Sequence, residues 1–279
     1  MKLYISFDME GITGARYWDD VTEGRGQYPE FRRIGTGEVN AAIEGAMEAG
    51  VTSILVRDSH GPARNLLPEE LHPNAEYITG WVARNQTMAG LDSTFDAAFL
   101  IGYHSKAGTP NGVLSHTYMG RQFRSVELNG EEVGEIGLAA ALAGRFNVPI
   151  ALVTGDVAAV REAQDLLAGV QAVAVKEGLD RFTAKSLSPS ESRSLIRDAA
   201  RRSIEQLQSV AVYRPATPVR LEIELHSISM GTAVSWIPGF ERDGARNVSF
   251  EHDDFEVIYN AMVVAGMVAE SPGVDDPNF

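Results

Sequence analysis

The 279-residue sequence predicts an α/β protein with a mostly parallel, doubly wound sheet and a second, smaller α+β lobe. Short apolar runs typical of buried strands alternate with stretches of helical periodicity through about residue 175, the pattern of a parallel sheet with helices on both faces. After about residue 180, a helix-capping sequence and a proline-bearing linker precede a strand with one polar face. Apolar residues make up 44% of the chain, enough to fill a large core.

The first strand–helix unit is the most regular part of the sequence. Residues 2–9 alternate between apolar and polar side chains, as a strand requires. Residues 39–47 then place apolar side chains at helical spacing, and Gly50 follows where a helix would end in the left-handed conformation. Residues 51–56 form a second strand, which runs out into a polar loop.

Three further apolar runs predict strands: residues 75–79, 96–103 and 148–154. A hairpin interrupts this alternation, because Asn129-Gly130 is the best dipeptide for a two-residue turn and joins residues 123–128 to residues 132–133. A stretch rich in alanine and leucine, residues 134–145, follows the hairpin and predicts a helix.

The last third of the chain predicts the smaller lobe. Ser188 opens a capping box with proline at the first helical position, and the helix extends to about residue 207. Residues 219–225 alternate as a strand with one exposed face, and residues 254–269 form an apolar helix that we expect to return to the main sheet. The predicted division is a main domain of residues 1–180 plus 250–279 and a smaller lobe of residues 181–249.

The net charge and the absence of cysteine limit the classes of partner and of metal ligand that we expect. The formal net charge is −14, which repels phosphate backbones and anionic lipids, so we expect no nucleic-acid and no membrane partner. The N-terminus does not resemble a secretory signal, and no uncharged stretch approaches the roughly 18 residues of a membrane span, so the expected location is cytoplasmic. Because the chain has no cysteine, any metal must use imidazole and carboxylate ligands.

Polar side chains collect where the predicted strands end: Asp8, Glu10, Asp58, His60, His104 and Asp156. In open α/β sheets, ligands bind beyond the carboxyl ends of the strands. Asp8 and Glu10 are two residues apart on one strand, so their carboxylates leave the same face and would repel each other without a cation. Gly11 would let the backbone turn sharply and approach a ligand. A metal site is therefore one interpretation of this set.

Each of these residues also has an ordinary structural explanation. A single carboxylate at a strand end is more often a solvated loop residue or a helix cap, and His60 and His104 could be buried histidines bonded to backbone carbonyls. Asp58 could orient His60 from behind. Glu135 lies near the start of a predicted helix, where a carboxylate complements the helix dipole, and the pattern alone does not select it.

His116 lies in a glycine-rich, polar stretch before the hairpin, and it could be a proton shuttle or an ordinary loop histidine. His72, His226 and His252 receive no role. No His-Glu-x-x-His helix, phosphate-binding loop or Gly-x-Ser-x-Gly elbow competes with the metal site. Magnesium-dependent phosphoryl chemistry is an alternative for the carboxylates, although the two histidines favour a softer ion.

The segment Ser6-Phe7-Asp8-Met9-Glu10-Gly11 closes the first predicted strand. It is similar to the Ser-x-Asp-x-Glu-Gly signature of the D-aminopeptidase family encoded with bacterial dipeptide-transport systems. Further similar motifs follow in the same order: Asp58-Ser59-His60, Leu71-His72-Pro73, Gly102-Tyr103-His104, Ser115-His116, Gly134-Glu135-Ile136-Gly137, Val175-Lys176 and residues 185–189. The resemblance extends to about residue 270, while residues 14–34 and the polar tail match less clearly.

The resemblance implies a zinc-dependent aminopeptidase with two zinc ions per subunit. It implies that Asp8 is shared by both ions and that Glu10 and His60 complete one site. His104 and Glu135 would complete the other site. His116 corresponds to the presumed catalytic side chain of the family.

The resemblance also implies short peptide substrates, a preference for D-residues and a homo-oligomer, which in that family is a decamer. The preference for D-residues rests on the resemblance alone. An L-aminopeptidase or an amidase built on the same site is an alternative, and so is a non-catalytic peptide-binding accessory of a transporter.

Overall fold

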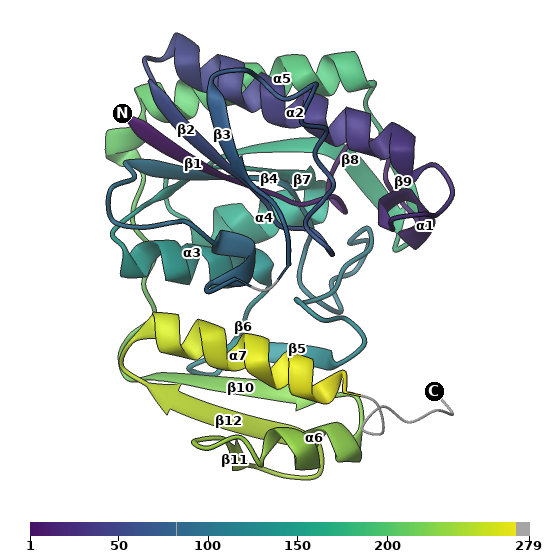
Figure 1. The fold of residues 1–279 in the computed structure, drawn as a ribbon, viewed down its shortest axis with the longest axis vertical. Helices are drawn as coiled ribbons and strands as arrows, with labels where there is room; N and C mark the ends of the chain where they lie inside the picture. The colour runs from purple at the N-terminus through teal and green to yellow at the C-terminus, as the bar shows by residue number, and fades with distance from the viewer. Residues whose placement is uncertain (82, 272–279) are drawn as a thin grey trace.

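The computed structural model describes residues 1–81 and 83–271, so the predicted polar tail lies almost entirely outside the described residues. The chain forms two stacked parts, each built on its own sheet (Figure 1). The large part holds a seven-stranded sheet in the order β3-β2-β1-β4-β7-β8-β9, and the small part holds a five-stranded sheet in the order β11-β12-β10-β5-β6. The predicted fold class is confirmed.

In the large sheet, neighbouring strands from β3 to β8 run parallel, and β9 is antiparallel to β8. The strands are β1 (Lys2–Phe7), β2 (Ser53–Asp58), β3 (Ala75–Ile78), β4 (Ala97–Tyr103), β7 (Ile150–Asp156), β8 (Gln171–Asp180) and β9 (Thr183–Ser186). β2 and β3 are added in turn on one side of β1, and β4 then pairs with the other side of β1. This reversal opens a crevice at the carboxyl ends of β1 and β4, where ligands bind in such folds.

Helices cover both faces of the large sheet: α2 (Tyr28–Glu48), α3 (Glu135–Arg145), α4 (Val157–Leu166) and α5 (Pro189–Glu205). Figure 1 shows α2 and α5 side by side on one face, with α3 and α4 on the other, as a doubly wound sheet requires. The two helices of the first pair approach closely at Gly45, where a Cβ atom would lie 2.1 Å from the carbonyl oxygen of Arg197. Shorter helical segments are α1 (Trp18–Val21) and two 3₁₀ turns, Gln86–Met88 and Leu207–Ser209.

The small part is an antiparallel sheet with two helices packed on it. Its elements are β5 (Phe123–Leu128), β6 (Glu131–Glu132), β10 (Val219–Leu225), α6 (Ile228–Val234), β11 (Glu241–Arg242), β12 (Asn247–His252) and α7 (Phe255–Ala269). The predicted hairpin is present, and its turn residues Asn129 and Gly130 have φ of 54° and 82°, as a tight hairpin turn demands. α7 lies between the small sheet and α3 (Figure 1).

These two parts divide the chain differently from the predicted boundaries. β9 and α5, expected in the smaller lobe, pack in the large part against β8 and α2. The β5–β6 hairpin and α7, expected in the main domain, belong to the small part, because β5 pairs with β10 and α7 packs on the small sheet. Pairs such as Val126 opposite Ile223 join segments far apart in sequence, and local periodicity does not encode such partners.

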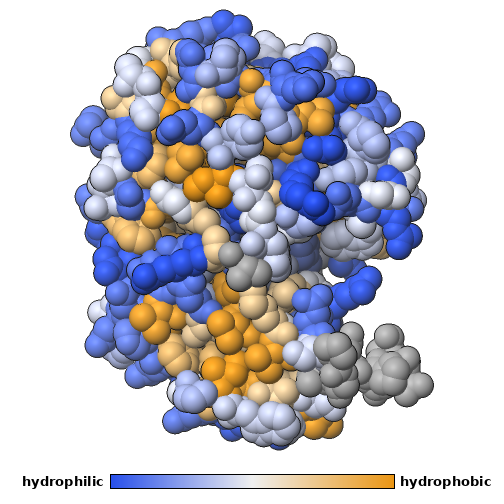
Figure 2. Space-filling model, viewed as in Figure 1, coloured by the Kyte–Doolittle hydropathy of each residue, from blue (hydrophilic) through white to orange (hydrophobic). Residues whose placement is uncertain are grey.

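Among the described residues, no helix combines the length and the apolar character that crossing a membrane requires. Figure 2 shows an apolar area on the small part, over α7. The exposed apolar side chains of this helix are Val257 and Val264, which are 39% and 44% exposed. They border a shallow hollow that is also lined by Ile237, Phe240 and Phe250.

Candidate metal centre

The five predicted metal ligands and His116 gather at the crevice where the strand order reverses. Asp8 and Glu10 follow β1, His60 follows β2, and His104 follows β4, so neighbouring parallel strands deliver them to one edge of the sheet. Glu135 is the first residue of α3 and completes the cluster.

Asp8 lies at the centre of this cluster. Its Oδ1 is 3.3 Å from Nδ1 of His60, and its Oδ2 is 3.6 Å from Nε2 of His104. The same nitrogen of His60 is 2.9 Å from Oε2 of Glu10, and the same nitrogen of His104 is 3.1 Å from Oε1 of Glu135. The two oxygens of one aspartate therefore face two separate histidine–glutamate pairs.

Each histidine of the cluster has one ring nitrogen hydrogen-bonded to a backbone carbonyl oxygen. The contacts are His60 Nε2 to the Val21 oxygen at 2.8 Å, His104 Nδ1 to the Ser105 oxygen at 2.9 Å, and His116 Nδ1 to the Leu114 oxygen at 2.9 Å. A carbonyl oxygen only accepts hydrogen bonds, so these nitrogens carry the proton and donate. The other nitrogen of each neutral ring then turns a lone pair towards the carboxylates, the orientation typical of metal-ligating histidines.

Buried atoms at the centre of the cluster lack hydrogen-bond partners in the described chain: Asp8 Oδ2, Glu10 Oε2 and His104 Nε2. Their neighbours lie within ion-pair distance but not in hydrogen-bonding geometry. Ligand atoms of Asp8, Glu10 and His104 lie within 4.8 Å of one another, and so do those of His104, His116 and Glu135. Converging imidazole and carboxylate groups without other partners fit a zinc site.

Burial and neighbouring charges shift the titration of these groups. Burial, followed by the charge of Glu10, raises the pKa of Asp8 to about 7. Burial opposes protonation of His104, but Glu135 and Asp8 outweigh it and raise the pKa of His104 to about 10. The pKa of His60 is likewise well above its ordinary range, because Glu10 and Asp8 outweigh its burial. The cluster thus concentrates negative charge that protons or metal cations must neutralise.

His116 lies at the edge of the cluster, with Nε2 3.6 Å from Oε1 of Glu135. Its ring stacks on that of His104 with centroids 4.0 Å apart, and Trp18 packs edge-on against it at 5.5 Å. Burial, followed by the nearby His104, lowers the pKa of His116, so its imidazole is neutral at neutral pH. Trp18, the first residue of α1, was not predicted to take part, and the available signal was the pair of adjacent aromatic residues Tyr17 and Trp18 in a mostly polar stretch.

The backbone around His116 is strained. Leu114 and Tyr118 on either side of it have φ of 54° and 60°, a region that bulky residues avoid at a cost of about 1 kcal/mol each. The loop is held in place because the N–H of Val113 donates to Asp156 and the N–H of Tyr118 donates to Glu135 at 2.8 Å. The surrounding structure therefore fixes the position of the imidazole.

Two glycines let the ends of β1 and β4 approach each other. A Cβ atom on Gly11 would lie 1.9 Å from the carbonyl oxygen of Tyr103, and one on Gly102 would lie 2.1 Å from that of Asp8. The N–H of Gly11 donates to the Gly102 oxygen at 2.7 Å. Gly11 is thus required by the neighbouring strand, whereas the sequence had suggested the approach of a ligand.

Asp58 and Asp156, the other strand-end aspartates, shape loops. Asp58 accepts hydrogen bonds from the N–H of Leu66 at 2.8 Å and from the side chain of Asn65 at 2.7 Å, which fixes the loop after His60. Asp156 caps α4 by accepting from the N–H of Ala159 at 2.7 Å. The ring of His60 is oriented by Val21, as described above, so the suggested direct role of Asp58 is replaced by a backbone carbonyl.

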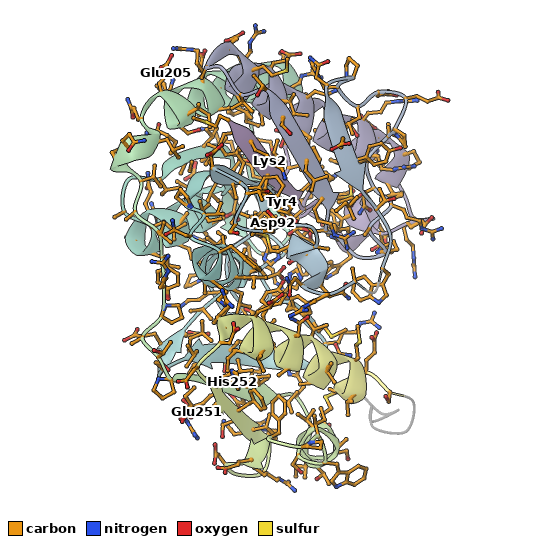
Figure 3. All side chains as sticks on the ribbon, turned by 60° about the vertical axis from the view of Figure 1, so that its left-hand side comes forward. Lys2, Tyr4, Asp92, Glu205, Glu251 and His252 are labelled. Carbon is orange, nitrogen blue, oxygen red and sulfur yellow. The ribbon has the colours of Figure 1, made fainter. Side chains whose placement is uncertain are left out.

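Of the histidines without a predicted role, His226 lines the cavity that begins at His116, while His252 lies away from the cluster. His226 and His252 are exposed, and Figure 3 shows His252 beside Glu251 on the small part. The N–H of Asp254 donates to Nδ1 of His252 at 2.9 Å, which makes this histidine part of a local turn.

Lys176 supports the loop after β1 and entered the sequence analysis only as part of a motif. Its side chain is buried, and Nζ donates to the carbonyl oxygens of Glu10, Ile12 and Ala15, the last two at 2.9 and 2.6 Å. Burial lowers the pKa of Lys176 to about 8, so the ammonium form still prevails at neutral pH. A lysine within an apolar strand was the signal that could have revealed it.

Replacing Lys176 with methionine is expected to lower the free energy of unfolding by about 2–4 kcal/mol, because buried carbonyl groups lose their charged donor. Urea denaturation of the metal-free protein measures this change. The matched control is Lys185→Met on β9, an exposed position where we expect a change within about 0.5 kcal/mol. Equal unfolding free energies for the two variants would contradict this role of Lys176.

Comparisons with known proteins identify the family of the chain. A family model described as D-aminopeptidase, peptidase family M55, matches residues 1–264. The chain is 38% identical over 265 residues to a D-aminopeptidase of Bacillus subtilis (strain 168), which covers 95% of this chain and 96% of that protein.

A solved structure of similar fold is the Zn-dependent D-aminopeptidase DppA from Bacillus subtilis, described as a self-compartmentalizing protease. It matches with a TM-score of 0.95 and 36% identity, covering 98% of this chain and 99% of that one. The family resemblance of the sequence motifs is confirmed, and the chain belongs to the D-aminopeptidase family, peptidase family M55.

Proposed function

We propose that this protein is a zinc-dependent aminopeptidase that removes N-terminal residues, preferentially of D-configuration, from short peptides. Family membership supports peptide hydrolysis, and the descriptions of the Bacillus subtilis relatives support both zinc and the D-preference. The observation that carries the proposal is the position of Asp8, whose two oxygens face two histidine–glutamate pairs.

We propose two zinc ions per subunit, both held by Asp8. Glu10 and His60 would complete one site, and His104 and Glu135 the other. Bound zinc at such a site supplies Lewis-acid polarisation of a carbonyl group and lowers the pKa of a coordinated water. The pairing of ligands follows the short distances between each histidine and its glutamate.

His116 is the proposed proton-transfer residue. Its Nδ1–H is committed to the Leu114 carbonyl, so Nε2 is the atom that can take up a proton at the reaction centre. The lowered pKa keeps Nε2 unprotonated and ready to accept at neutral pH. The same nitrogen would then return the proton to the leaving amine.

The amino end of the substrate would lie near one metal or near Glu10, beside the reacting bond. Holding it there would restrict cleavage to the first residue of a peptide. A cavity of about 660 Å³ begins at His116 and extends along β5, with room for the rest of a short peptide.

We further propose that the chain forms a homo-oligomer. The similar solved structure is described as self-compartmentalizing, and the apolar area over α7 is typical of a subunit contact (Figure 2). The decamer and the cytoplasmic location implied at the sequence level stay predictions.

Elemental analysis of the purified protein, combined with hydrolysis of D-alanine and L-alanine p-nitroanilides before and after chelation, tests the proposed function. We expect about two zinc ions per chain and cleavage that favours the D-substrate, is abolished by chelation and returns with added zinc. No transition metal after zinc resupply would overturn the metal mechanism and favour a non-catalytic peptide-binding role. Equal or better cleavage of the L-substrate would overturn the D-preference alone.

A further inference from the structure

Two cavities meet at His116. The cavity of about 660 Å³ lies between residues 107–111 and strands β5 and β10, and a second one of about 330 Å³ is lined by Trp18, Thr22 and Arg121. Both are also lined by His116, Gly120 and Arg181. A molecule bound with its reacting bond at His116 therefore extends into a space bordered by the side chain of Arg181.

Arg181 is an exposed residue that contacts the loop of His116. It lies in the turn between β8 and β9, and its carbonyl oxygen accepts from the N–H of Leu114 at 3.0 Å. Its Nη2 donates to the carbonyl oxygen of Ser115 at 3.2 Å, and its guanidinium lies 5.4 Å from the ring centroid of Phe182. Phe182 in turn stacks on Tyr17, the residue before Trp18. The guanidinium is thus positioned before any substrate arrives.

The guanidinium of Arg181 pairs with no carboxylate of the described chain, and neither does that of Arg121 in the same small cavity. Arg124, which lines the large cavity, is instead paired with Glu224 at 3.3 Å. The carboxylate of Asp180 is engaged by the backbone N–H of Arg181 at 2.7 Å. In a chain with 38 acidic and 24 basic residues, unpaired arginines beside the reaction centre are available for an anionic ligand.

The expected substrate has a matching anionic group. In a dipeptide or tripeptide cut after its first residue, the C-terminal carboxylate lies within about 4–7 Å of the scissile bond, because an extended chain spans at most about 3.6 Å per residue. Because the amino end of the substrate would face the metal ligands, that carboxylate lies on the opposite side of the scissile bond. Arginine binds carboxylates through two parallel hydrogen bonds, which fixes direction as well as charge.

We propose that Arg181 binds the C-terminal carboxylate of dipeptide and tripeptide substrates, so that the enzyme selects short peptides with a free carboxyl end. Arg121 adds positive potential to the same cavity. This inference rests on the proposed peptidase function. In it, Arg181 determines the length of the peptides that bind, whereas the metal ligands and His116 act at the scissile bond.

The test measures binding to the zinc-loaded protein in a His116→Ala background, which separates binding from turnover. Isothermal titration calorimetry compares the dipeptide of D-alanine with its C-terminal amide. We expect the dipeptide to bind about 10–100-fold more tightly than the amide, and Arg181→Gln to remove that preference. Arg181→Lys keeps the charge without the paired geometry and should retain part of it. The control Arg124→Gln, in the same cavity, should leave the preference unchanged.

An unchanged preference in Arg181→Gln, or a background protein that binds the acid and the amide equally or binds neither, would overturn the proposal. Turnover of D-alanine p-nitroanilide, which has no carboxylate, is measured with Arg181→Gln in the otherwise unaltered enzyme. Turnover of the D-alanine dipeptide is measured in the same way, and we expect Arg181→Gln to lower kcat/KM at least about tenfold more for the dipeptide than for the p-nitroanilide, because only the dipeptide offers a carboxylate. Equal losses for the two substrates would overturn carboxylate binding and leave Arg181 the role of holding the loop of His116 through Ser115. A wild-type protein that hydrolyses no substrate would overturn the peptidase function, while the binding comparison would still decide the role of Arg181.

Discussion

Replacing His116 with alanine is expected to lower kcat by about 10²–10⁴-fold while the zinc content stays at the wild-type level. The ring of His116 lies at the edge of the ligand cluster, and its Nε2 is the free atom for proton transfer because Nδ1 donates to Leu114. Steady-state kinetics on a short peptide, together with elemental analysis of the same sample, measures both quantities.

The control for this variant is His252→Ala, which removes an exposed histidine of the small part and should leave kcat and zinc unchanged (Figure 3). Loss of zinc together with activity in the His116 variant would show that His116 is a metal ligand. Its Nε2 lies 3.6 Å from Oε1 of Glu135, within a group of side chains that could hold a metal ion. Full activity would assign the proton transfer to another group.

Asp8→Asn is expected to abolish zinc binding at both proposed sites and to lower kcat/KM by at least about 10³-fold. The amide that replaces the carboxylate carries no charge and turns an NH₂ group towards one of the two histidines. Both histidine–glutamate pairs lose their shared carboxylate at once, whereas a change at Glu135 removes a ligand from only one pair.

Asp156→Asn is the matched control, because Asp156 is also an aspartate at a strand end but caps α4. Asparagine keeps one acceptor for the cap to Ala159 but turns its NH₂ towards the N–H of Val113, so we expect normal zinc content and a loss of stability of about 1–3 kcal/mol. If Asp8→Asn retained two zinc ions per chain, the shared role of Asp8 would be wrong, and each metal would need a separate carboxylate.

Much of the fold follows from local patterns in the sequence. The alternation of residues 2–9 predicted β1, and Asn129-Gly130 predicted the hairpin, because the period of the side chains and the positive φ of a turn are local properties. The boundaries between the two parts could not be predicted from local patterns. The hairpin pairs with β10 and α5 packs on α2 through surfaces that come together only in three dimensions.

The candidate site could likewise be predicted only in part from local sequence patterns. Strand ends and motifs pointed to Asp8, Glu10, His60 and His104, whereas Glu135 needed the family resemblance, since an acidic residue at a helix start has an ordinary explanation. The carbonyls that orient the histidines, such as that of Val21, carry no sequence signature at all. Arg181 is likewise distinguished by the contacts that hold it and by its lack of a described acidic partner.

The path of the chain through the small part has a consequence for biosynthesis. Residues 123–132 leave the large part after His116, form the β5–β6 hairpin and return at Glu135, yet the partner strand of β5 is Val219–Leu225. In a growing chain, all the proposed zinc ligands therefore emerge well before the small sheet can be completed. Until β10 emerges, β5 has an open edge on which another nascent chain can pair. Chaperone protection would thus matter most while the middle of the protein is being translated, after the residues of the candidate site are made and before the small sheet closes.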